Sequence, residues 1–496
     1  MKPLITPAAM RAMERRYFDE TGTLSIDLME TAARSLCDII LKRYGPDKLI
    51  GFACGPGGNG GDGYACARMY REAGGRAFII STGEPTSPDA AENLRRACKA
   101  GVPEDLEARP DIWVDALYGT GLSRAPTGLS AELIDRINAD HASGSAVIAV
   151  DIPSGLNGLT GMAYHPCVRA DLTCTFQYVK PGCFLADGLD VAGEVLTLDI
   201  GIPEAFYPAD SPAIIDESDI HAFLSKRPRN FHKGNAGHLL IVAGSFGMAG
   251  AAALCALSAM VCGAGLVTIA CPRSIVPMLQ TLAPCAMCVP LPEADGAISA
   301  EAVDVLKAIL PGKDAVVCGC GLSRRASLEV IQTVLACGLP ALLDADGLNI
   351  ISENDALKAM LHPHHLLTPH PGEAARLLGK RIENPIDDAF KLKVLGCQTL
   401  LKGSATVIPV GNRALLSVSG TSGMAKGGSG DCLSGVIGAL MAQNKMLTGD
   451  KLAMCAAVGS ELHGLAGEAA AKKRGIHGMT PLDLIDALPE VLKRYE

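Results

Sequence analysis

The sequence is poor in aromatic residues and has no excess of positive charge. Of its 496 residues, 4% are aromatic and one is tryptophan, and the formal net charge is −9. Proteins that bind nucleic acid through its phosphates carry a basic surface, so this charge balance argues against a nucleic-acid partner. With 48% hydrophobic residues the chain can bury large cores. Its length suits two large domains or about three of ordinary size.

The chain also lacks the cysteine pattern of a zinc site or of a small disulfide scaffold. Its 18 cysteines are spread along a long chain and lie in apolar stretches such as Leu254-Cys255-Ala256. Neither Cys285-x-x-Cys288 nor Cys318-x-Cys320 has a second ligand pair at zinc spacing. Met1-Lys2-Pro3 leads into a charged segment and not into the apolar core of a signal peptide. We therefore expect a cytoplasmic protein with reduced cysteines.

One uncharged stretch imitates a membrane span. No residue from Leu239 to Pro272 carries a formal charge, and the stretch exceeds the roughly 20 residues that cross a bilayer. Five glycines divide it into a strand-like run, an alanine-rich helix over 251–262 and a second strand-like run. The sequence therefore predicts a buried β-α-β unit here and no membrane partner.

Strand-like runs alternate with helical stretches in two series, which predicts α/β architecture. The first series opens with helical patterns over 6–18 and 24–43, and its strand-like runs are 49–54, 76–81, 112–117 and 146–152. A proline-rich stretch from Gly201 to Pro212 then interrupts the pattern. The strand-like runs of the second series are 238–243, 315–318, 341–344, 366–369 and 399–402. We expect a Rossmann-like, doubly wound domain over residues 1–212 and a second α/β domain over residues 213–496.

The most informative segment is Gly427-Gly428-Ser429-Gly430-Asp431, which precedes apolar residues at helical spacing. The backbone N–H groups of such a loop bind anions, together with the positive end of the helix dipole. Asp431, in the first turn, could then take a proton from a substrate hydroxyl as that hydroxyl attacks phosphorus. For this segment alone, an ordinary glycine-rich turn capped by Asp431 is the alternative.

Three polar loops follow strands in the first half of the chain. The turn from Gly55 to Gly63 suits a diphosphate but lacks the G-x-G-x-x-G pattern of nicotinamide-dependent dehydrogenases. Segments 115–122 and 151–158 follow two further strands, and loops after parallel strands meet at one edge of a sheet. Their oxygens could hold a monovalent cation, and one carboxylate could act as acid or base. Taken singly, each aspartate could instead be a turn former. The residues expected to converge are Asn59, Asp115, Asp151 and Ser154.

These segments, in this order, resemble a known family. The first half, from Ala9 to Gly201, is similar to the NAD(P)H-hydrate epimerase domain. The second half, from Asn230 onward, is similar to the ADP-dependent NAD(P)H-hydrate dehydratase, whose fold is ribokinase-like. Joined in this order, the halves resemble the bifunctional NAD(P)H-hydrate repair family. The segments that carry the resemblance are Asn59-Gly60-Gly61-Asp62-Gly63, Val150 to Gly155, Leu367 to Glu373, Lys402 to Thr406 and Gly427 to Asp431.

For the N-terminal half, the resemblance implies interconversion of the R and S epimers of hydrated NADH and NADPH, written here as NADHX and NADPHX. It implies Asp151 as the catalytic acid/base and a potassium ion (K+) held by Asn59, Asp115 and Ser154. The substrate-binding residues that it implies are Gly58, Asn59, Gly60, Gly61, Asp62, Gly119, Thr120, Gly121, Leu122, Ser123 and Arg124.

For the C-terminal half, the resemblance implies dehydration of the S epimer to NADH or NADPH. ADP is the phosphoryl donor, with Mg2+ beside it, and AMP and phosphate are released. Asp431 is implied as the base, and Gly321 and His370 as substrate contacts. The implied nucleotide-binding residues are Lys402, Gly403, Ser404, Ala405, Thr406 and Gly430.

Several of these residues have simpler interpretations when they are taken without the family. His370 could merely cap the helix expected over 372–378, and Lys402 could be a solvated charge at a strand end. Asp344 and Asp346 follow another strand and are further candidates for the phosphate or metal environment, with turn formation as the alternative.

Two other functions stay open at this point. A ribokinase-like kinase for a vitamin precursor would use the same Gly427 to Asp431 loop, although the Lys402 loop and the fused first domain argue against it. The N-terminal half could also be a non-catalytic binding module, although the retained Asn59, Asp115, Asp151 and Ser154 argue for activity. Apolar surfaces and the habit of the family favour a homo-oligomer.

Overall fold

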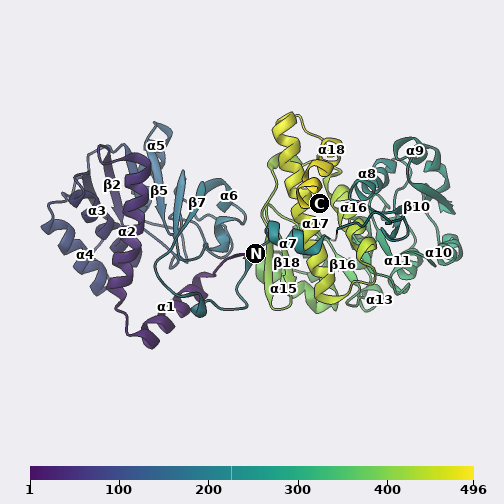
Figure 1. The fold of residues 1–496 in the computed structure, drawn as a ribbon, viewed down its shortest axis with the longest axis horizontal. Helices are drawn as coiled ribbons and strands as arrows, with labels where there is room; N and C mark the ends of the chain where they lie inside the picture. The colour runs from purple at the N-terminus through teal and green to yellow at the C-terminus, as the bar shows by residue number, and fades with distance from the viewer. Residues whose placement is uncertain (225) are drawn as a thin grey trace. The chain divides into compact units, whose positions relative to one another are not determined.

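Strands and helices alternate along nearly the whole chain in the computed structural model, which describes residues 1–224 and 226–496 (Figure 1). Its contacts divide the chain into two units. One unit is Pro3–Pro212, and the other joins Met1–Lys2 to Ala213–Glu496. The division lies at the end of the proline-rich stretch.

The first unit is built on one parallel sheet of six strands. The order across the sheet is β3 (Arg76–Ser81), β2 (Leu49–Cys54), β4 (Ile112–Ala116), β5 (Ala146–Val150), β6 (Leu172–Phe176) and β7 (Glu194–Leu198). The four strand-like runs predicted for this half are confirmed as β2 to β5. Strands β6 and β7 were not predicted. The reversal of strand order beside β2 gives the doubly wound form.

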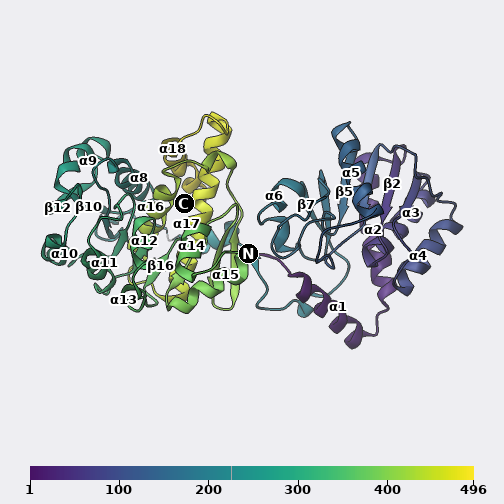
Figure 2. The same ribbon diagram turned by 180° about the vertical axis from the view of Figure 1, so that it is seen from behind.

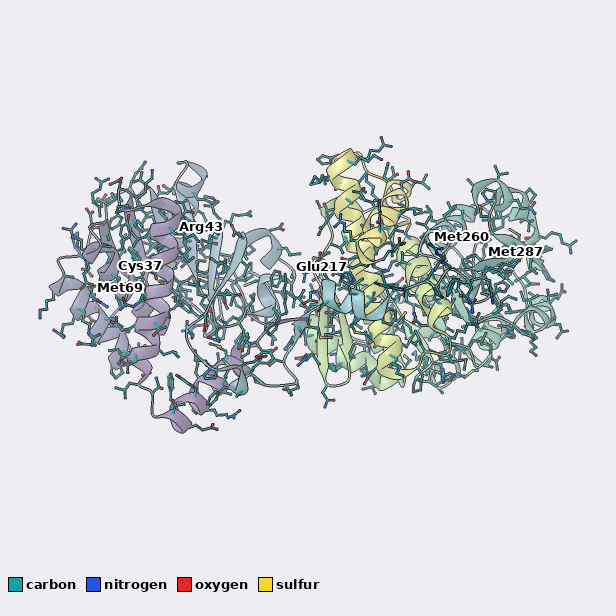
Figure 3. All side chains as sticks on the ribbon, viewed as in Figure 1. Cys37, Arg43, Met69, Glu217, Met260 and Met287 are labelled. Atoms are coloured by element: carbon teal, nitrogen blue, oxygen red, sulfur yellow. The ribbon has the colours of Figure 1, made fainter. Side chains whose placement is uncertain are left out.

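Helices cover both faces of this sheet, because alternate strand residues point to opposite faces. Side chains of β2 such as Phe52 pack with α2 (Ser25–Tyr44) and α3 (Gly58–Glu72), and α4 (Pro88–Lys99) packs beside α3. Cys37 of α2 and Met69 of α3 belong to this core (Figure 3). Trp113 of β4 points to the other face and packs with α5 (Leu129–Ala142). The remaining helices of the unit are α1 (Pro7–Thr21) and α6 (Gly188–Val191).

A bidentate ion pair ties α2 to the edge strand β7. The guanidinium of Arg43, labelled in Figure 3, donates to both carboxylate oxygens of Glu194, at 2.9 and 2.6 Å. Both side chains are partly exposed to solvent, so the pair orients the edge strand more than it stabilises the fold.

The second unit contains a parallel sheet of seven strands. The order is β11 (Met287–Leu291), β10 (Leu266–Pro272), β9 (His238–Val242), β14 (Ala315–Cys318), β15 (Ala341–Leu343), β16 (His365–Leu367) and β17 (Gln398–Thr399). All five strand-like runs predicted here are confirmed, with boundaries that differ by at most three residues. The uncharged stretch forms β9, α8 (Ala249–Val261) and β10, as predicted. Within residues 1–224 and 226–496, no helix combines the length and the apolar character needed to cross a membrane.

Most of the helical residues in the core shared with this sheet come from α8, α16 (Ser429–Asn444), α17 (Gly449–Arg474) and α18 (Pro481–Leu492). Helices α17 and α18 lie side by side in both ribbon views (Figures 1 and 2). The other helices are α7 (Glu217–Phe223), α9 (Val276–Leu282), α10 (Val303–Ile309), α11 (Leu328–Leu335), α12 (Asp346–Ser352), α13 (Asp355–Lys358), α14 (Pro371–Leu378) and α15 (Pro385–Leu392).

Two small sheets complete the second unit and were not predicted. One has the order β1 (Lys2–Pro3), β8 (Ala213–Ile214), β19 (Arg413–Ser417) and β18 (Thr406–Val410), and the other pairs β12 (Glu293–Ala294) with β13 (Ala297–Ile298). The terminal ammonium of Met1 lies 2.8 Å from the carboxylate of Asp216. Strands of two residues leave no periodic pattern in a sequence, which is why β1, β8, β12 and β13 were missed. Strands β18 and β19 have five residues each and were also not predicted.

Candidate active sites

A cavity of about 480 Å³ lies at the carboxyl edge of the six-stranded sheet. Its wall includes the glycine turn at Gly58 and Asn59, the segment Gly119 to Leu122, and Asp151. Ser123 and Arg124, which the sequence placed with the substrate-binding residues, do not line it in the part of the chain that the structure describes. Three predicted loops thus meet at this edge.

The glycine turn is packed too tightly for side chains at some of its positions. A Cβ atom on Gly60 would lie 1.8 Å from the carbonyl oxygen of Gly55, so no other residue fits there. Gly60 and Gly61 are buried behind the cavity wall, in the first turn of α3. The turn therefore exposes the positive end of α3 to the cavity, where it favours an anion.

Asp151 forms a buried ion pair at one end of this cavity. Lys180 is fully buried and its ammonium donates to Oδ1 of Asp151, to Oγ1 of Thr175 at 3.2 Å and to the carbonyl of Phe176 at 3.1 Å. Asp151 also has a left-handed backbone, with φ of 67°, which is unusual for a residue other than glycine and turns its side chain at the strand end. The lysine thus pairs with the buried carboxylate and fixes its orientation at the cavity wall.

Lys180 and Glu14 line the same cavity, and sequence reasoning missed both. Burial, helped by the nearby charge of Asp151, raises the pKa of Glu14 to about 7. Burial and the same carboxylate also raise the pKa of Asp62 well above its usual value. The sequence could have pointed to Lys180, because it is the only charged residue between Asp171 and Asp187. Glu14 can thus donate or accept a proton near neutral pH.

Asp115 and Ser154 meet beneath the cavity wall. Oδ1 of Asp115 accepts a hydrogen bond from the Ser154 hydroxyl at 2.6 Å, and Oδ2 accepts one from the Ser154 N–H at 2.7 Å. Burial raises the pKa of Asp115 to about 6, although these hydrogen bonds and one from the Leu117 N–H oppose the rise. Asn59 lies beside Gly119, with Oδ1 3.2 Å from the position that a Cβ on Gly119 would take. Nδ2 of Asn59 is buried without a hydrogen-bond partner in the described residues.

Removing the buried lysine should strongly destabilise the first unit. We expect Lys180→Met to lower the free energy of unfolding by about 3–5 kcal/mol, because it leaves the Asp151 carboxylate buried and unpaired. The double variant Asp151→Asn with Lys180→Met should recover part of this loss. Urea denaturation measures both, with Lys99→Met as a control at an exposed lysine. Equal stability of Lys180→Met and Lys99→Met would contradict the ion-pair assignment.

In the second unit, Lys402 and Asp344 form an ion pair beside the glycine loop. The Lys402 ammonium lies 2.7 Å from Oδ1 of Asp344, and the Ser434 hydroxyl donates to Oδ2 at 2.8 Å. A Cβ on Gly430 would lie 3.7 Å from the Lys402 Nζ and 3.9 Å from Oδ2 of Asp344. Burial opposes the charge of Lys402, but Asp344 and Glu373 outweigh it and raise the pKa of the lysine. Lys402 is therefore a partly buried, paired cation at the loop and not a solvated edge charge.

Asp431 lies in the first turn of α16, as predicted. Burial, reinforced by the charge of Asp344, raises its pKa to about 6. Gly428 precedes the helix with a left-handed φ of 102°, which turns the loop into the helix start. The imidazole of His463 stays neutral because burial lowers its pKa to about 4, and its Nε2 contacts the Ser429 carbonyl at 2.9 Å. The loop is thus fixed from behind by α17.

The other residues predicted for this site have more varied surroundings. His370 is half exposed and caps α14, because its Nδ1 accepts from the Gly372 N–H at 3.0 Å. The carbonyl of Gly321 accepts from the Ser245 hydroxyl at 2.9 Å, and Oδ2 of Asp346 accepts from the Ser323 N–H at 2.8 Å. Gly403 and Ser404 are exposed, Ala405 is buried, and Thr406 begins β18. Within residues 1–224 and 226–496, none of their side chains forms a hydrogen bond with the Lys402 ammonium or the Asp344 carboxylate, so their roles stay predictions.

Comparison with known sequences covers both units. A family profile described as NAD(P)H-hydrate dehydratase matches residues 239–490, and one described as YjeF-related protein N-terminus matches residues 25–182. The chain is 36% identical over 523 aligned residues to the bifunctional NAD(P)H-hydrate repair enzyme of Moorella thermoacetica, covering 99% of this chain and 97% of that one. The chain belongs to the bifunctional NAD(P)H-hydrate repair family. Both halves of the family are therefore present, in the order expected from the sequence.

Solved structures match the second unit. A ribokinase-like superfamily protein of Enterococcus faecalis covers 57% of this chain and 95% of its own, at 24% identity and a TM-score of 0.50. This likeness confirms the ribokinase-like fold of the second α/β unit. An ADP/ATP-dependent NAD(P)H-hydrate dehydratase of Bacillus subtilis, co-crystallised with ATP and Mg2+, is 28% identical and covers 58% of this chain and 100% of its own, with a TM-score of 0.48.

Proposed function

We propose that this chain repairs hydrated nicotinamide nucleotides with two active sites. The first unit interconverts the R and S epimers of NADHX and NADPHX, and the second dehydrates the S epimer with ADP as phosphoryl donor. Family membership along nearly the whole chain supports the pair of activities. The observation that carries the proposal is the grouping of Lys402, Asp344 and Asp431 around the glycine loop, which joins a phosphate site to a base.

In the first unit, we assign the proton transfers of epimerisation to Asp151. Its carboxylate lines the cavity and accepts a hydrogen bond from the Lys180 ammonium, which holds it in place to accept a proton from the substrate and return it. Glu14, with a pKa of about 7, supplies a second group able to donate or accept a proton at the same end. The glycine turn of α3 suits the diphosphate of the substrate.

In the second unit, Asp431 removes the proton from the C6 hydroxyl of the hydrate as that oxygen attacks the β-phosphorus of ADP, and AMP leaves. The C6–O bond then breaks, phosphate departs with the electron pair, and a proton is lost from C5, which restores the ring double bond. Lys402 and the N–H groups of the loop stabilise the charge on the transferring phosphoryl group. The test is stoichiometry: S-NADHX and ADP should yield equal amounts of NADH, AMP and phosphate, and AMP formation without NADH would contradict the scheme.

Mg2+ fits this site as an ion shared with the nucleotide. In the described residues, no three histidine, cysteine, aspartate or glutamate side chains form a metal cluster. Mg2+ is commonly held by one or two carboxylates together with substrate phosphates. Asp344 and Asp346 are the carboxylates after β15 that could serve, and the ion would neutralise charge on the phosphates.

K+ suits the buried oxygen atoms behind the wall of the first cavity. Asp115 is buried, and hydrogen bonds from Ser154 and Leu117 are its only stabilising contacts in the described residues, with no cationic side chain among them. The amide nitrogen of Asn59 is buried without a partner in the described residues, so this side chain is not held by a hydrogen bond from that nitrogen. A monovalent cation held by Asn59, Asp115 and Ser154 would neutralise the buried carboxylate.

Potassium should therefore stabilise the first unit in a pH-dependent manner. The pKa of Asp115, about 6, lies above that of an unfolded aspartate, so ionisation of Asp115 destabilises the fold as the pH rises. K+ offsets this loss only where Asp115 is ionised. We expect KCl to raise the melting temperature by about 5 °C at pH 8, relative to choline chloride, and to have little effect at pH 5. Calorimetry measures this shift. An equal shift in Asp115→Asn would contradict the site.

A further inference from the structure

The cavity of the first unit extends along the sheet edge in strand order. Its lining residues follow β3 (Asp89), β2 (Asn59), β4 (Gly119), β5 (Asp151) and β6 (Lys180). Strands β3 and β5 are separated by two other strands in the sheet. With neighbouring strands about 4.8 Å apart, the positions that follow β3 and β5 lie roughly 14 Å from each other. This length suits a dinucleotide that lies along the edge.

The order of the chemistry along the cavity fixes the direction of such a ligand. The reacting ring belongs at Asp151 and Lys180, where the proton-transfer groups are. The diphosphate belongs in the middle, at the positive end of α3 beside Asn59. The adenosine ribose is then left for the end that follows β3, where Asp89 lies.

Asp89 is held at that end by a contact with α2. It is the second residue of α4, and its Oδ2 accepts a hydrogen bond from the Ser25 hydroxyl at 2.5 Å. Both residues line the cavity, and Asp89 is half-buried. Within residues 1–224 and 226–496, the second carboxylate oxygen of Asp89, Oδ1, forms no hydrogen bond or ion pair. One carboxylate oxygen is thus fixed while the other stays available to a ligand hydroxyl.

The charge at this end is unfavourable for a phosphate. Lys180 is the only lysine or arginine among the described residues that line the cavity, and it lies at the opposite end in its pair with Asp151. A second phosphate placed beside Asp89 would meet a carboxylate with no cation to compensate, although the start of α4 offers a weak positive dipole. A ribose diol would instead donate a hydrogen bond to the free oxygen.

We propose that Asp89, positioned by Ser25, binds the adenosine ribose hydroxyls and makes the epimerase site prefer NADHX to NADPHX. An acidic residue that binds the ribose hydroxyls is the usual discriminator against a 2′-phosphate in dinucleotide sites. The inference rests on the proposed epimerase function. It adds a specificity determinant that lies outside the loops carrying the family resemblance.

The test compares kcat/KM for epimerisation of NADHX and NADPHX. The unaltered chain should favour NADHX at least tenfold, and Asp89→Asn should reduce this ratio about tenfold, mainly through KM. Ser25→Ala keeps the charge of Asp89 but removes the hydrogen bond that positions its carboxylate. The preference of this variant for NADHX should lie between those of the unaltered chain and Asp89→Asn. Glu84→Gln removes an exposed charge from the same loop and should leave the ratio unchanged. A ratio near one in the unaltered chain, or an unchanged ratio in Asp89→Asn, would overturn the assignment.

A binding measurement separates this inference from the function on which it rests. The affinities of NADH and NADPH, followed by their fluorescence, are compared between the unaltered chain and Asp89→Asn. If neither hydrate is epimerised but the NADH to NADPH affinity ratio still falls in Asp89→Asn, the epimerase proposal fails and the role of Asp89 stands. If epimerisation proceeds and neither ratio changes, the role of Asp89 fails and the epimerase stands.

Discussion

Asp431→Asn is expected to lower kcat for nucleotide-dependent dehydration by about 1,000-fold while leaving epimerisation intact. The amide keeps the size of the carboxylate but cannot accept the proton of the C6 hydroxyl. In the unaltered chain, kcat/KM should fall tenfold per pH unit below the pKa of Asp431, about 6, because the base is then protonated. Release of AMP and recovery of the reduced ring measure both effects.

The matched control for this variant is Asp355→Asn. Asp355 also lies in the first turn of a helix, α13, and its side chain is 96% exposed. Its removal should leave dehydration unchanged. If Asp431→Asn still dehydrates the substrate, and its kcat/KM still falls below pH 6, the base is another group. Asp344 would be the next candidate.

Asp151→Asn is expected to have the second large effect, a loss of about 1,000-fold in the rate of R to S conversion. Dehydration of pure S-NADHX should persist, because the second site lies in a separate unit of the chain. The epimer ratio, followed by chromatography without nucleotide, measures this rate. Because Lys180 is left buried without its partner, the melting temperature of the variant must be recorded beside its activity.

Asp19→Asn is the control for this substitution, since Asp19 is an exposed carboxylate on α1. It should epimerise at the unaltered rate. If a folded Asp151→Asn variant also epimerises at that rate, Asp151 is not the acid/base, and the N-terminal unit would revert to the alternative of a binding module for hydrated nucleotides.

The strands that carry the two sites could be predicted from the sequence because their chemistry is local. Runs such as 49–54 are continuously apolar and end at a glycine turn, which is typical of a buried parallel strand. The loops after such strands share one sheet edge, so the convergence of the loop residues on one cavity followed from the pattern. Strand β6 was missed because threonines interrupt its apolar run, and β7 because it is a half-exposed edge strand.

The partners of the catalytic groups could not be predicted, because they come from distant parts of the chain. Lys180 lies 29 residues from Asp151, and the turn after β6 brings it back. Ser434 lies 90 residues from Asp344 and reaches it only when α16 packs against the seven-stranded sheet. Asp89 and Ser25 are likewise joined by the packing of α2 and α4, which no local pattern encodes.

Conversion of pure R-NADHX to NADH is the most direct measurement of the central claim, that one chain carries both activities. The protein is supplied with R-NADHX, ADP, Mg2+ and K+, and the absorbance of the reduced nicotinamide ring is followed. We predict that all of the R-NADHX is converted to NADH and that this conversion requires ADP. In Asp151→Asn, the conversion should proceed only at the slow rate of spontaneous epimerisation. No recovery from the R epimer, under conditions in which the S epimer is converted, would contradict the account.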